Sequence, residues 1–451
     1  MVAGPARFMI AGTHSGVGKT LLSAGIMAAL RERGHAVAPF KVGPDFIDPG
    51  YHSLGAGVPG RNLDAFMQGS DRIAPLLLHG AASADVAVVE GVMGLFDGRG
   101  STDEASSAHI AELTSTPVVL VVDASSASRS VAAQVHGFHT FHPRVRLSGV
   151  VFNRVGSDRH EALLRDAVEQ VGLPVLGAVR RHDALKVDSR HLGLIPAAEQ
   201  SVDAVDTVKA AAAIVAREVD LDQLMRLASE AGPLDAAPWD PASAVRRPAR
   251  PVRVAAASGA AFSFHYAEHS DLLRAAGAEV APFDPLQDEA LPEGAGALYI
   301  GGGFPEIYAE RLAANERLGA DIRRAAEAGM PVVAECGGML YLCETLEGRP
   351  MLGLLDASAS FTSRLTLGYR EAALGSDGLL GRAGLKVRGH EFHRTATTPS
   401  AGPSPAWLID GHRTEGFSTP SIHASYVHPS WVGTPELVDS FLSAAVKGVR
   451  A

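Results

Sequence analysis

The segment Ala11-Gly-Thr-His-Ser-Gly-Val-Gly-Lys-Thr20 constrains the fold most, because it follows a short apolar run and opens an amphipathic helix. In a phosphate loop, glycines let backbone N–H groups converge on phosphate oxygens, and the helix N-terminus adds positive potential. Lys19 is then expected to reach the outer phosphates, and the Thr20 hydroxyl to bind magnesium. Motif and flanks agree, so we prefer this interpretation to a glycine-rich turn with a chance Gly-Lys-Thr. The loop residues with a predicted binding role are Gly12, Thr13, Ser15, Gly16, Val17, Gly18, Lys19 and Thr20.

Length and composition limit the class of protein. The 451 residues are too many for one ordinary domain, and 46% hydrophobic residues are enough for two cores. A formal net charge of −10 argues against a nucleic-acid partner, because nucleic-acid binders carry a basic face. Two cysteines, Cys336 and Cys343, cannot form a disulfide framework, which indicates a reducing compartment. No apolar run approaches the roughly 20 residues of a membrane span or resembles a signal peptide, so we expect a cytoplasmic protein without a membrane partner.

The first half alternates short apolar runs with amphipathic helices. In the first helix, Leu22, Ile26 and Leu30 fall on one face. Continuous Val/Ile/Leu runs separated by helices predict a parallel sheet covered on both sides, and therefore an α/β fold. The predicted strands of this half are 8–11, 36–40, 86–89, 118–123, 148–153 and 175–179.

A change of composition divides the chain. Five prolines and no hydrophobic periodicity occur in 230–251, which predicts a linker between a 1–229 domain and a 252–451 domain. The α/β alternation then restarts, with an Ala-rich helix over 320–328. The predicted strands of this half are 252–256, 279–283, 297–300 and 331–334.

Three carboxylates follow strands of the first half. Asp45 and Asp48 come after the second predicted strand, and Glu90 ends the third. Ligands of an open parallel sheet collect beyond the carboxyl ends of its strands, and Mg²⁺ takes carboxylate and phosphate oxygens. Singly, each carboxylate is better explained as a solvated surface group, but together they favour a metal site beside the phosphate loop. Asn153, at the end of another strand, is either an adenine contact or a turn residue.

In the second half, Pro331-Val-Val-Ala-Glu-Cys-Gly-Gly-Met-Leu-Tyr-Leu342 predicts a strand, a tight turn and a helix, with Cys336 at the turn. This is a nucleophile elbow, in which the helix start favours a thiolate. Gly337 can free an N–H for an oxyanion, and Gly302 and Gly303, at the end of another strand, can supply a second donor. Cys343, seven residues further along and expected inside the helix, is better explained as a buried structural cysteine.

A cysteine nucleophile needs a base within hydrogen-bond reach. The candidates are His390, His393, His423 and His428. A single histidine is more often a surface or core residue than a catalytic one, and the spacing does not choose among the four. We favour His428.

At this point the motifs resemble a known family, the cobyrinic/hydrogenobyrinic acid a,c-diamide synthases of cobalamin biosynthesis. The first half is similar to dethiobiotin synthetase, whose phosphate loop also has one extra residue. The second half resembles a class I glutamine amidotransferase of the cobyric acid type. The match runs in order over nearly the whole chain. The motifs that carry it are Gly12–Thr20, Lys-Val-Gly-Pro-Asp-Phe-Ile-Asp48, Glu-Gly-Val-Met-Gly-Leu-Phe-Asp97, Ser189-Arg-His-Leu-Gly-Leu194, Gly-Gly-Gly-Phe-Pro-Glu306, Ala-Glu-Cys-Gly-Gly338 and His-Ala-Ser-Tyr-Val-His428.

The resemblance implies an amidoligase. ATP would phosphorylate the a or c carboxylate of the corrinoid, and ammonia from glutamine would displace the phosphate, so that two rounds give the diamide. Cys336 would form a thioester with glutamine, and His428 would raise its nucleophilicity. The family further implies hydrogenobyrinate or cobyrinate, L-glutamine and ATP as partners, and leaves a homodimer open. The implied phosphate-side contacts are ATP on Gly12–Thr20, magnesium on Thr20, Asp45 and Glu90, and Asp48 and Asp97 near the reacting carboxylate.

Two departures and several alternatives accompany this assignment. His428 is followed by Pro429 and Ser430 rather than by a glutamate two residues later, so the group that orients it is unknown. Ser258 and Gly259 stand where many relatives carry an Arg-Asp pair, which puts a polar role there in doubt. We favour hydrogenobyrinate over cobyrinate, and keep cobyric acid synthase as a further alternative. A partitioning-type ATPase switch is a different class; it carries a lysine where His14 stands and does not need the cysteine half.

Overall fold

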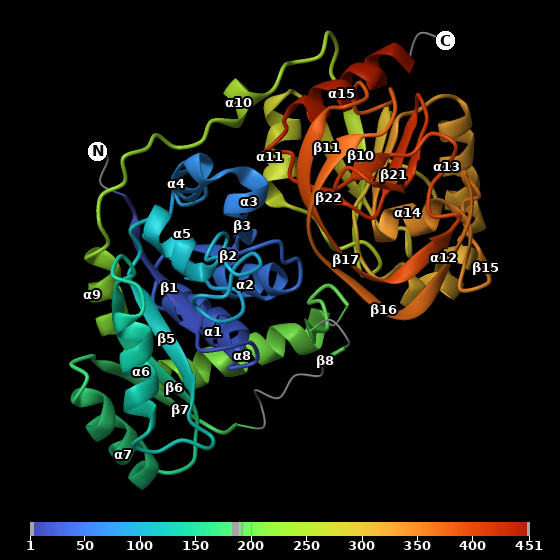
Figure 1. Cartoon of the computed structure of the whole chain (residues 1–451). Coiled ribbons are helices and arrows are strands. Elements are labelled where there is room, and N and C mark those ends of the chain that lie inside the picture. Colours follow the sequence, from blue (N-terminus) through green and yellow to red (C-terminus); the bar gives the residue numbers. More distant parts are fainter. Residues whose placement is uncertain (1–3, 183–188, 191–192, 200, 449–451) are drawn as a thin grey trace. The chain divides into compact units, whose positions relative to one another are not determined.

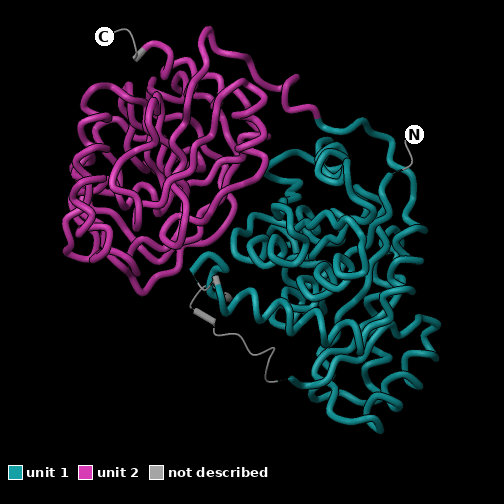
Figure 2. The backbone as a smooth tube through the Cα atoms, turned by 180° about the vertical axis from the view of Figure 1, so that it is seen from behind, with its two compact units in different colours: residues 1–239 teal, residues 240–451 magenta. Residues whose placement is uncertain are grey.

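The computed structural model describes residues 4–182, 189–190, 193–199 and 201–448. It divides into two compact units, one ending at Trp239 and the other beginning at Asp240 (Figure 2). This division falls inside the 230–251 segment. Both units are α/β, and each is described separately below.

A seven-stranded parallel sheet forms the first unit (Figure 1). Six of its strands are the predicted ones, and the seventh, β3, has only three residues at one edge. The order β3-β2-β4-β1-β5-β6-β7 places β1 at the centre, so the loop after β1 lies between those after β4 and β5. The strands are β1 Ala6–Gly12, β2 Val37–Val42, β3 Arg61–Leu63, β4 Val86–Glu90, β5 Val118–Asp123, β6 Leu147–Val155 and β7 Val175–Arg180.

The helices of this unit follow the predicted amphipathic pattern. In α1, Leu22, Ile26 and Leu30 are all buried, as their spacing requires. Short hairpin strands β8 Ser189–Arg190 and β9 Gly193–Leu194 come from the Ser189–Leu194 motif, whose two central residues lie outside the described residues. The helices are α1 Lys19–Glu32, α2 Asp48–Ala56, α3 Ala65–Gln68, α4 Ser70–Gly80, α5 Ser107–Leu113, α6 Val131–Thr140, α7 Asp158–Glu169, α8 Ser201–Glu218 and α9 Leu221–Ser229.

The second unit contains a six-stranded sheet of order β11-β10-β12-β13-β21-β20, parallel except for β20. Its first four strands in the chain are the predicted ones. The strands are β10 Arg253–Ala257, β11 Glu279–Phe283, β12 Ala297–Ile300, β13 Val332–Glu335, β20 Phe417–Ser418 and β21 Ile422–Ser425. The helices are α10 Pro241–Ala244, α11 Ala267–Ala275, the 3₁₀ helix η2 Pro305–Tyr308, α12 Ala309–Ala314, α13 Glu316–Glu327, α14 Gly337–Leu342 and α15 Glu436–Gly448.

A second sheet in this unit is mostly antiparallel, and simple α/β alternation did not predict it. Its path is β15-β14-β16-β17-β22, with β18 and β19 attached to β16. The pairing of β17 with β22 brings His390 opposite His428. The strands are β14 Cys343–Leu346, β15 Arg349–Pro350, β16 Leu355–Leu374, β17 Lys386–Thr398, β18 Trp407–Ile409, β19 Arg413–Glu415 and β22 His428–Pro429.

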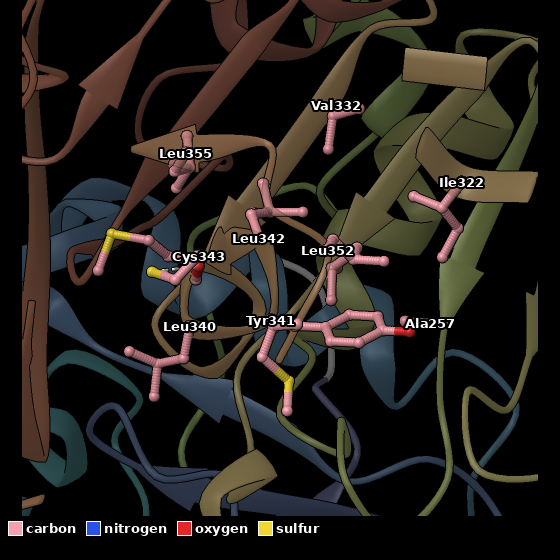
Figure 3. Close-up of a cluster of buried hydrophobic side chains, with 14 of the residues drawn as sticks. Ala257, Ile322, Val332, Leu340, Tyr341, Leu342, Cys343, Leu352 and Leu355 are labelled. Atoms are coloured by element: carbon pink, nitrogen blue, oxygen red, sulfur yellow. Dashed lines mark hydrogen bonds between the residues drawn. The ribbon is translucent and has the colours of Figure 1, made fainter. Parts of the chain in front are cut away.

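The core of the second unit lies around α14, and Figure 3 shows part of it, with Leu340, Tyr341 and Leu342 among the labelled side chains. Cys343 belongs to this core, but it begins β14 rather than continuing the helix, which corrects the expected position. Burial raises the pKa of its thiol to about 12. The Cys343 S–H donates to the Met339 carbonyl at 3.4 Å, as a structural cysteine would.

Candidate active sites

The phosphate loop connects β1 to α1 through two glycines in left-handed conformation, Gly16 (φ 81°) and Gly18 (φ 94°). A Cβ at Gly18 would lie 2.3 Å from Asn153 Nδ2, so no larger residue fits there. Asn153 Nδ2 also donates to the Val17 carbonyl at 2.8 Å. The end of β6 therefore holds the loop in place, and Asn153 lies beside the predicted nucleotide-contacting residues.

The remaining loop residues have distinct environments. The Val17 side chain is buried against Gly12, where a Cβ would lie 2.6 Å from Val17 Cγ2. The buried Thr13 hydroxyl has no hydrogen-bond partner among the described residues. Ser15 is exposed, and its carbonyl contacts His14 Nδ1 at 2.6 Å. The loop thus combines an apolar anchor with exposed polar groups.

Lys19 is buried at the start of α1. Its Nζ donates to the Met93 carbonyl at 2.6 Å and to the His14 carbonyl at 3.3 Å. Burial, followed by the neighbouring Lys41 ammonium, lowers the pKa of Lys19 to about 8. An anion at the loop would favour the charged form of this side chain.

Glu90 is the centre of a buried polar cluster at the ends of β2 and β4. Its Oε1 accepts from Thr20 Oγ1 at 3.1 Å and from Lys41 Nζ at 2.9 Å, and its Oε2 lies 2.5 Å from His52 Nε2. Lys41 Nζ also lies 2.6 Å from Asp48 Oδ2. The structure therefore joins three predicted site residues, Thr20, Asp48 and Glu90, and adds two that the sequence reasoning missed, Lys41 and His52.

Protonation in this cluster is set by competition between burial and charge. Burial would raise the pKa of Glu90, but Lys41 and His52 hold it below its ordinary value. Burial would lower the pKa of Lys41, but the Asp48 and Glu90 carboxylates hold it above its ordinary value. Burial and the Asp45 carboxylate raise the pKa of Asp48. Of Asp48 and Glu90, Asp48 is thus the carboxylate that accepts a proton more readily.

Asp45 and Asp97 have local backbone partners. Asp45 Oδ1 accepts from the N–H groups of Ile47 and Asp48, at 2.8 and 3.1 Å, and so fixes the turn that leads into α2. Asp97 Oδ2 accepts from the Gly94 N–H at 2.8 Å, in the loop whose Met93 carbonyl holds Lys19. Both carboxylates thereby have fixed positions, and the Asp97 loop borders the phosphate loop, because a Cβ at Gly94 would lie 3.0 Å from the Thr13 carbonyl oxygen.

Thr20 and Glu90 fit Mg²⁺ by donor type, since both offer oxygen atoms and lie in contact. Among the described residues, no group of three or more His, Cys, Asp or Glu is arranged to hold a metal ion. Protein oxygens would therefore supply only part of the coordination shell of a bound Mg²⁺. Mg²⁺ commonly completes such a shell with phosphate oxygens and water.

Cys336 occupies a strained turn between β13 and α14, with φ 49° and ψ −106°. Its N–H donates to the Ser425 carbonyl at 2.6 Å. A Cβ at Gly338 would lie 2.2 Å from the Ile300 carbonyl oxygen, and one at Gly337 would lie 3.0 Å from the Gly303 nitrogen. The backbone of the elbow therefore packs directly on the glycine segment Gly301–Gly303, which follows β12, and Gly337 is brought next to Gly303. Burial, then the Glu306 carboxylate, raises the pKa of the Cys336 thiol.

The four candidate histidines have different surroundings. A Cβ at Gly302 would lie 2.7 Å from Cε1 and 3.2 Å from Nε2 of His428, so this ring faces the glycine segment that packs on the elbow. His390 stacks on His428 with ring centroids 5.0 Å apart. His393 stacks on Tyr426, and the buried His423 has no hydrogen-bond partner for either ring nitrogen among the described residues. Of the four, His428 is therefore the one whose ring is shown to face the glycine segment on which the elbow packs.

Comparison with known proteins covers both units. Residues 8–195 match the CobQ/CobB/MinD/ParA nucleotide binding domain, and residues 253–435 match the CobB/CobQ-like glutamine amidotransferase domain. A hydrogenobyrinate a,c-diamide synthase from Streptomyces coelicolor is 53% identical, over 97% of this chain and 96% of the relative.

This chain belongs to the a,c-diamide synthase family. Another family member, a hydrogenobyrinate a,c-diamide synthase from Thermobifida fusca, is 49% identical over 97% of this chain and 96% of its own. A cobyrinate a,c-diamide synthase from a Synechococcus is 42% identical over 97% of both chains. The two matched domains confirm the predicted two-domain α/β architecture, and the amidotransferase domain argues against a partitioning-type ATPase.

Some polar residues at the two sites of this a,c-diamide synthase family member escaped the sequence reasoning. Arg154, at φ 60°, donates to the Gly16 carbonyl at 2.9 Å and pairs with Asp123. Glu335 contacts His428, from the residue just before Cys336. Lys41 and Glu335 lie inside motifs that were recognised, so their position in the motif was a usable signal. Lys41 meets Asp48 of its own motif, but its contact with Glu90 and that of Glu335 with His428 span 49 and 93 residues, which the motifs do not encode.

Across the described residues, no helix combines the length and apolar character needed to span a bilayer.

Proposed function

We propose that this chain catalyses the ATP-dependent amidation of the a and c carboxylates of hydrogenobyrinate, with glutamine or ammonia as nitrogen donor. The observation that carries the proposal is 53% identity over 97% of the chain to a relative of that name, in a chain that has both a phosphate loop and a cysteine elbow. Because the nucleophile must remain a reduced thiol, we place the activity in the cytoplasm.

The glutaminase half would use Cys336 as nucleophile. Its sulfur attacks the side-chain amide carbon of glutamine while His428 takes the thiol proton. The backbone N–H groups of Gly337 and of Gly302 or Gly303 stabilise the oxyanion, and the packing of Gly337 on Gly303 supports this arrangement. His428 then gives the proton to the leaving nitrogen, so ammonia departs and water hydrolyses the thioester.

Burial of Cys336 determines how this step starts. A raised thiol pKa means that the resting cysteine is neutral, so removal of the proton must accompany attack. A base beside the nucleophile is therefore required, rather than a pre-formed thiolate. We assign this base to His428, because its ring faces Gly302 in the glycine segment beside the elbow.

In the ligase half, backbone N–H groups of Gly12–Thr20 would bind the ATP phosphates, with Lys19 on the outer ones. Asn153, which already contacts this loop, would meet the adenine. The substrate carboxylate attacks the γ-phosphate to give an acyl phosphate and ADP, and ammonia then displaces phosphate to give the amide. Phosphoryl transfer of this kind depends mainly on positioning and charge neutralisation.

Asp48 and Asp97 would lie near the reacting carboxylate, and Thr20, Asp45 and Glu90 would hold Mg²⁺. Bound there, the ion would neutralise charge on the phosphates. The contact between the Thr20 hydroxyl and the Glu90 carboxylate supports this placement. The raised pKa of Asp48 suits a group that exchanges a proton with the incoming ammonia.

Substrate choice is the part of the proposal that most needs a direct test. The hydrogenobyrinate relatives quoted above are 53% and 49% identical and the cobyrinate relative 42%, which favours the metal-free corrinoid. The chain would be incubated with ATP, Mg²⁺, glutamine and each corrinoid, and the products measured by mass spectrometry. We expect a two-amide mass gain on hydrogenobyrinate. A two-amide mass gain only on cobyrinate would mean that cobyrinate is the substrate. A gain of four amides on the a,c-diamide, supplied as a further substrate, would indicate a cobyric acid synthase. Light scattering would decide whether the enzyme is a homodimer.

A further inference from the structure

The end of β13 carries a buried carboxylate that contacts the histidine of the glutaminase site. Glu335 Oε2 lies 3.2 Å from His428 Nδ1, and both side chains are at most 5% exposed. The other ring edge of His428, Cε1 and Nε2, faces Gly302. Glu335 therefore contacts the imidazole through Nδ1 and leaves Nε2, on the side that faces Gly302, without a contact to this carboxylate.

The polypeptide offers no acid immediately after His428, because Pro429 and Ser430 follow it. Asp284 lies beside Gly259, at the position where many relatives carry an Arg-Asp pair, and its carboxylate is occupied by other hydrogen bonds. Its carboxylate accepts from the Leu286 N–H at 2.9 Å and from Gln287 Nε2 at 2.7 Å. Glu335, in contrast, contacts His428 directly.

We propose that Glu335 is the positioning residue of the glutaminase site, holding the His428 imidazole through Nδ1 so that Nε2 is free to take the Cys336 proton. This inference rests on the proposed glutaminase function. When sulfur attacks the amide carbon, the thiol proton moves to Nε2 and the ring becomes an imidazolium. Nδ1–H continues to donate to Glu335, which stays ionised and takes no proton. Nε2 then returns the proton to the departing nitrogen, so atoms and charges balance.

The remaining contacts of Glu335 agree with this role. The Tyr299 hydroxyl donates to Oε2 at 3.3 Å, and Oε1 has no hydrogen-bond partner among the described residues. A buried carboxylate with so few donors is costly unless a positive charge faces it. The imidazolium that forms during the reaction supplies that charge at the step where the barrier is crossed.

Several other titratable groups surround this pair, and any pH effect must be judged against them. His390 is stacked on His428, and burial lowers the pKa of His390 well below its ordinary value. Burial likewise lowers the pKa of His265 and His269. Burial therefore disfavours the charged form of all three rings. His265, His269 and His390 interact with His428, and Tyr299 and Cys336 interact with Glu335. The Glu306 and Glu391 carboxylates also act on Cys336, and Glu391 and Arg370 act on His390.

The test compares Glu335→Gln, Glu335→Asp and Tyr299→Phe with the unchanged chain. Glutamate release measures the glutaminase, and ammonia-supported synthesis reports an intact ligase half. We expect Glu335→Gln to lose about 100-fold in kcat for glutamine with little change in KM, because orientation and charge support act on the base. The acidic limb of its pH profile should move to lower pH, because removing an anion disfavours the protonated ring. Glu335→Asp should recover part of the rate, and Tyr299→Phe, which keeps the carboxylate, should lose little.

The outcomes separate this inference from the function on which it rests. An unchanged kcat and pH profile in Glu335→Gln would overturn the role of Glu335 alone. A rise in KM with an unmoved pH profile would also overturn it, since that pattern indicates only a structural contact. Failure of the unchanged chain to release glutamate would overturn the glutaminase function itself. If Glu335→Gln does not fold, Glu335→Asp decides: a rate equal to that of the unchanged chain with an unmoved profile is the overturning result, and a reduced kcat at constant KM supports the inference.

Discussion

Lys41 Nζ lies 2.6 Å from Asp48 Oδ2, and the two side chains are only 4% and 14% exposed. The same ammonium lies 2.9 Å from Glu90 Oε1. One buried cation thus lies between the buried Glu90 and the partly buried Asp48, close to the phosphate loop. This arrangement makes the ligase half sensitive to the charge of a single side chain.

Lys41→Met should lower the free energy of unfolding by roughly 3–5 kcal/mol, because it leaves buried carboxylates without their cation. Urea unfolding measures the loss. The matched control is Lys209→Met, which breaks a pair whose side chains are both 70% exposed and should cost at most about 1 kcal/mol. Equal losses in the two variants would contradict the importance of the buried cluster.

Cys336→Ser should lower glutamine-supported synthesis by roughly 10³-fold or more, because a hydroxyl is a far weaker nucleophile in this site. Ammonia-supported synthesis should persist, since the ligase half does not use the thiol. Cys343→Ala is the matched control, because Cys343 is buried in the core and should leave both activities in place. Loss of ammonia-supported synthesis in Cys336→Ser would refute the division of labour between the halves.

Binding of Mg-ATP should take up protons above neutral pH. The pKa of Lys19 is lowered to about 8 in the free chain, so Lys19 is mostly neutral at higher pH, and a bound phosphate favours its charged form. If binding restores full protonation, uptake is roughly three-quarters of a proton at about pH 8.5 and about a tenth at pH 7. Calorimetry in buffers of different ionisation enthalpy measures both values. Equal uptake at the two pH values would contradict a depressed Lys19 pKa.

Gly18→Ala should weaken ATP binding at least about tenfold and destabilise the chain by about 1–3 kcal/mol, because its φ of 94° disfavours a side chain and Asn153 Nδ2 fills the space. Gly34→Ala is the control. Gly34 has a similar φ of 91° but no atom within 4 Å of the added Cβ, so it should destabilise the chain without changing ATP affinity. Equal ATP affinities in both variants would show that the Asn153 contact does not shape the loop.

The sequence predicted the features that depend on local pattern. The parallel strands are continuous apolar runs, and the Lys19 loop and the Cys336 elbow each carry their turn chemistry in adjacent residues. The antiparallel strand β16 was not predicted, because the buried side chains near its start, such as Ala357 and Ala359, are small. They alternate with the exposed Asp356 and Ser358. Such an alternation carries little hydrophobic contrast.

The polar pairs of the two sites were not predicted from the sequence, for a different reason. Contacts such as Glu335 with His428 join residues far apart in the chain, and only strand order and register bring them together. Both residues lie in recognised motifs. The motifs do not indicate that the acid before the nucleophile, rather than an acid after the histidine, contacts the imidazole ring.

The glycine segment after β12 and the glycines of the elbow leave no space for a Cβ at Gly302, Gly303, Gly337 or Gly338. The surface offered to the substrate amide there is main chain. The hydrogen-bond donors there are therefore backbone N–H groups, which point substitutions can displace but cannot replace with another chemical group. Adaptation of this enzyme to a different nitrogen source or rate must come from residues around that surface.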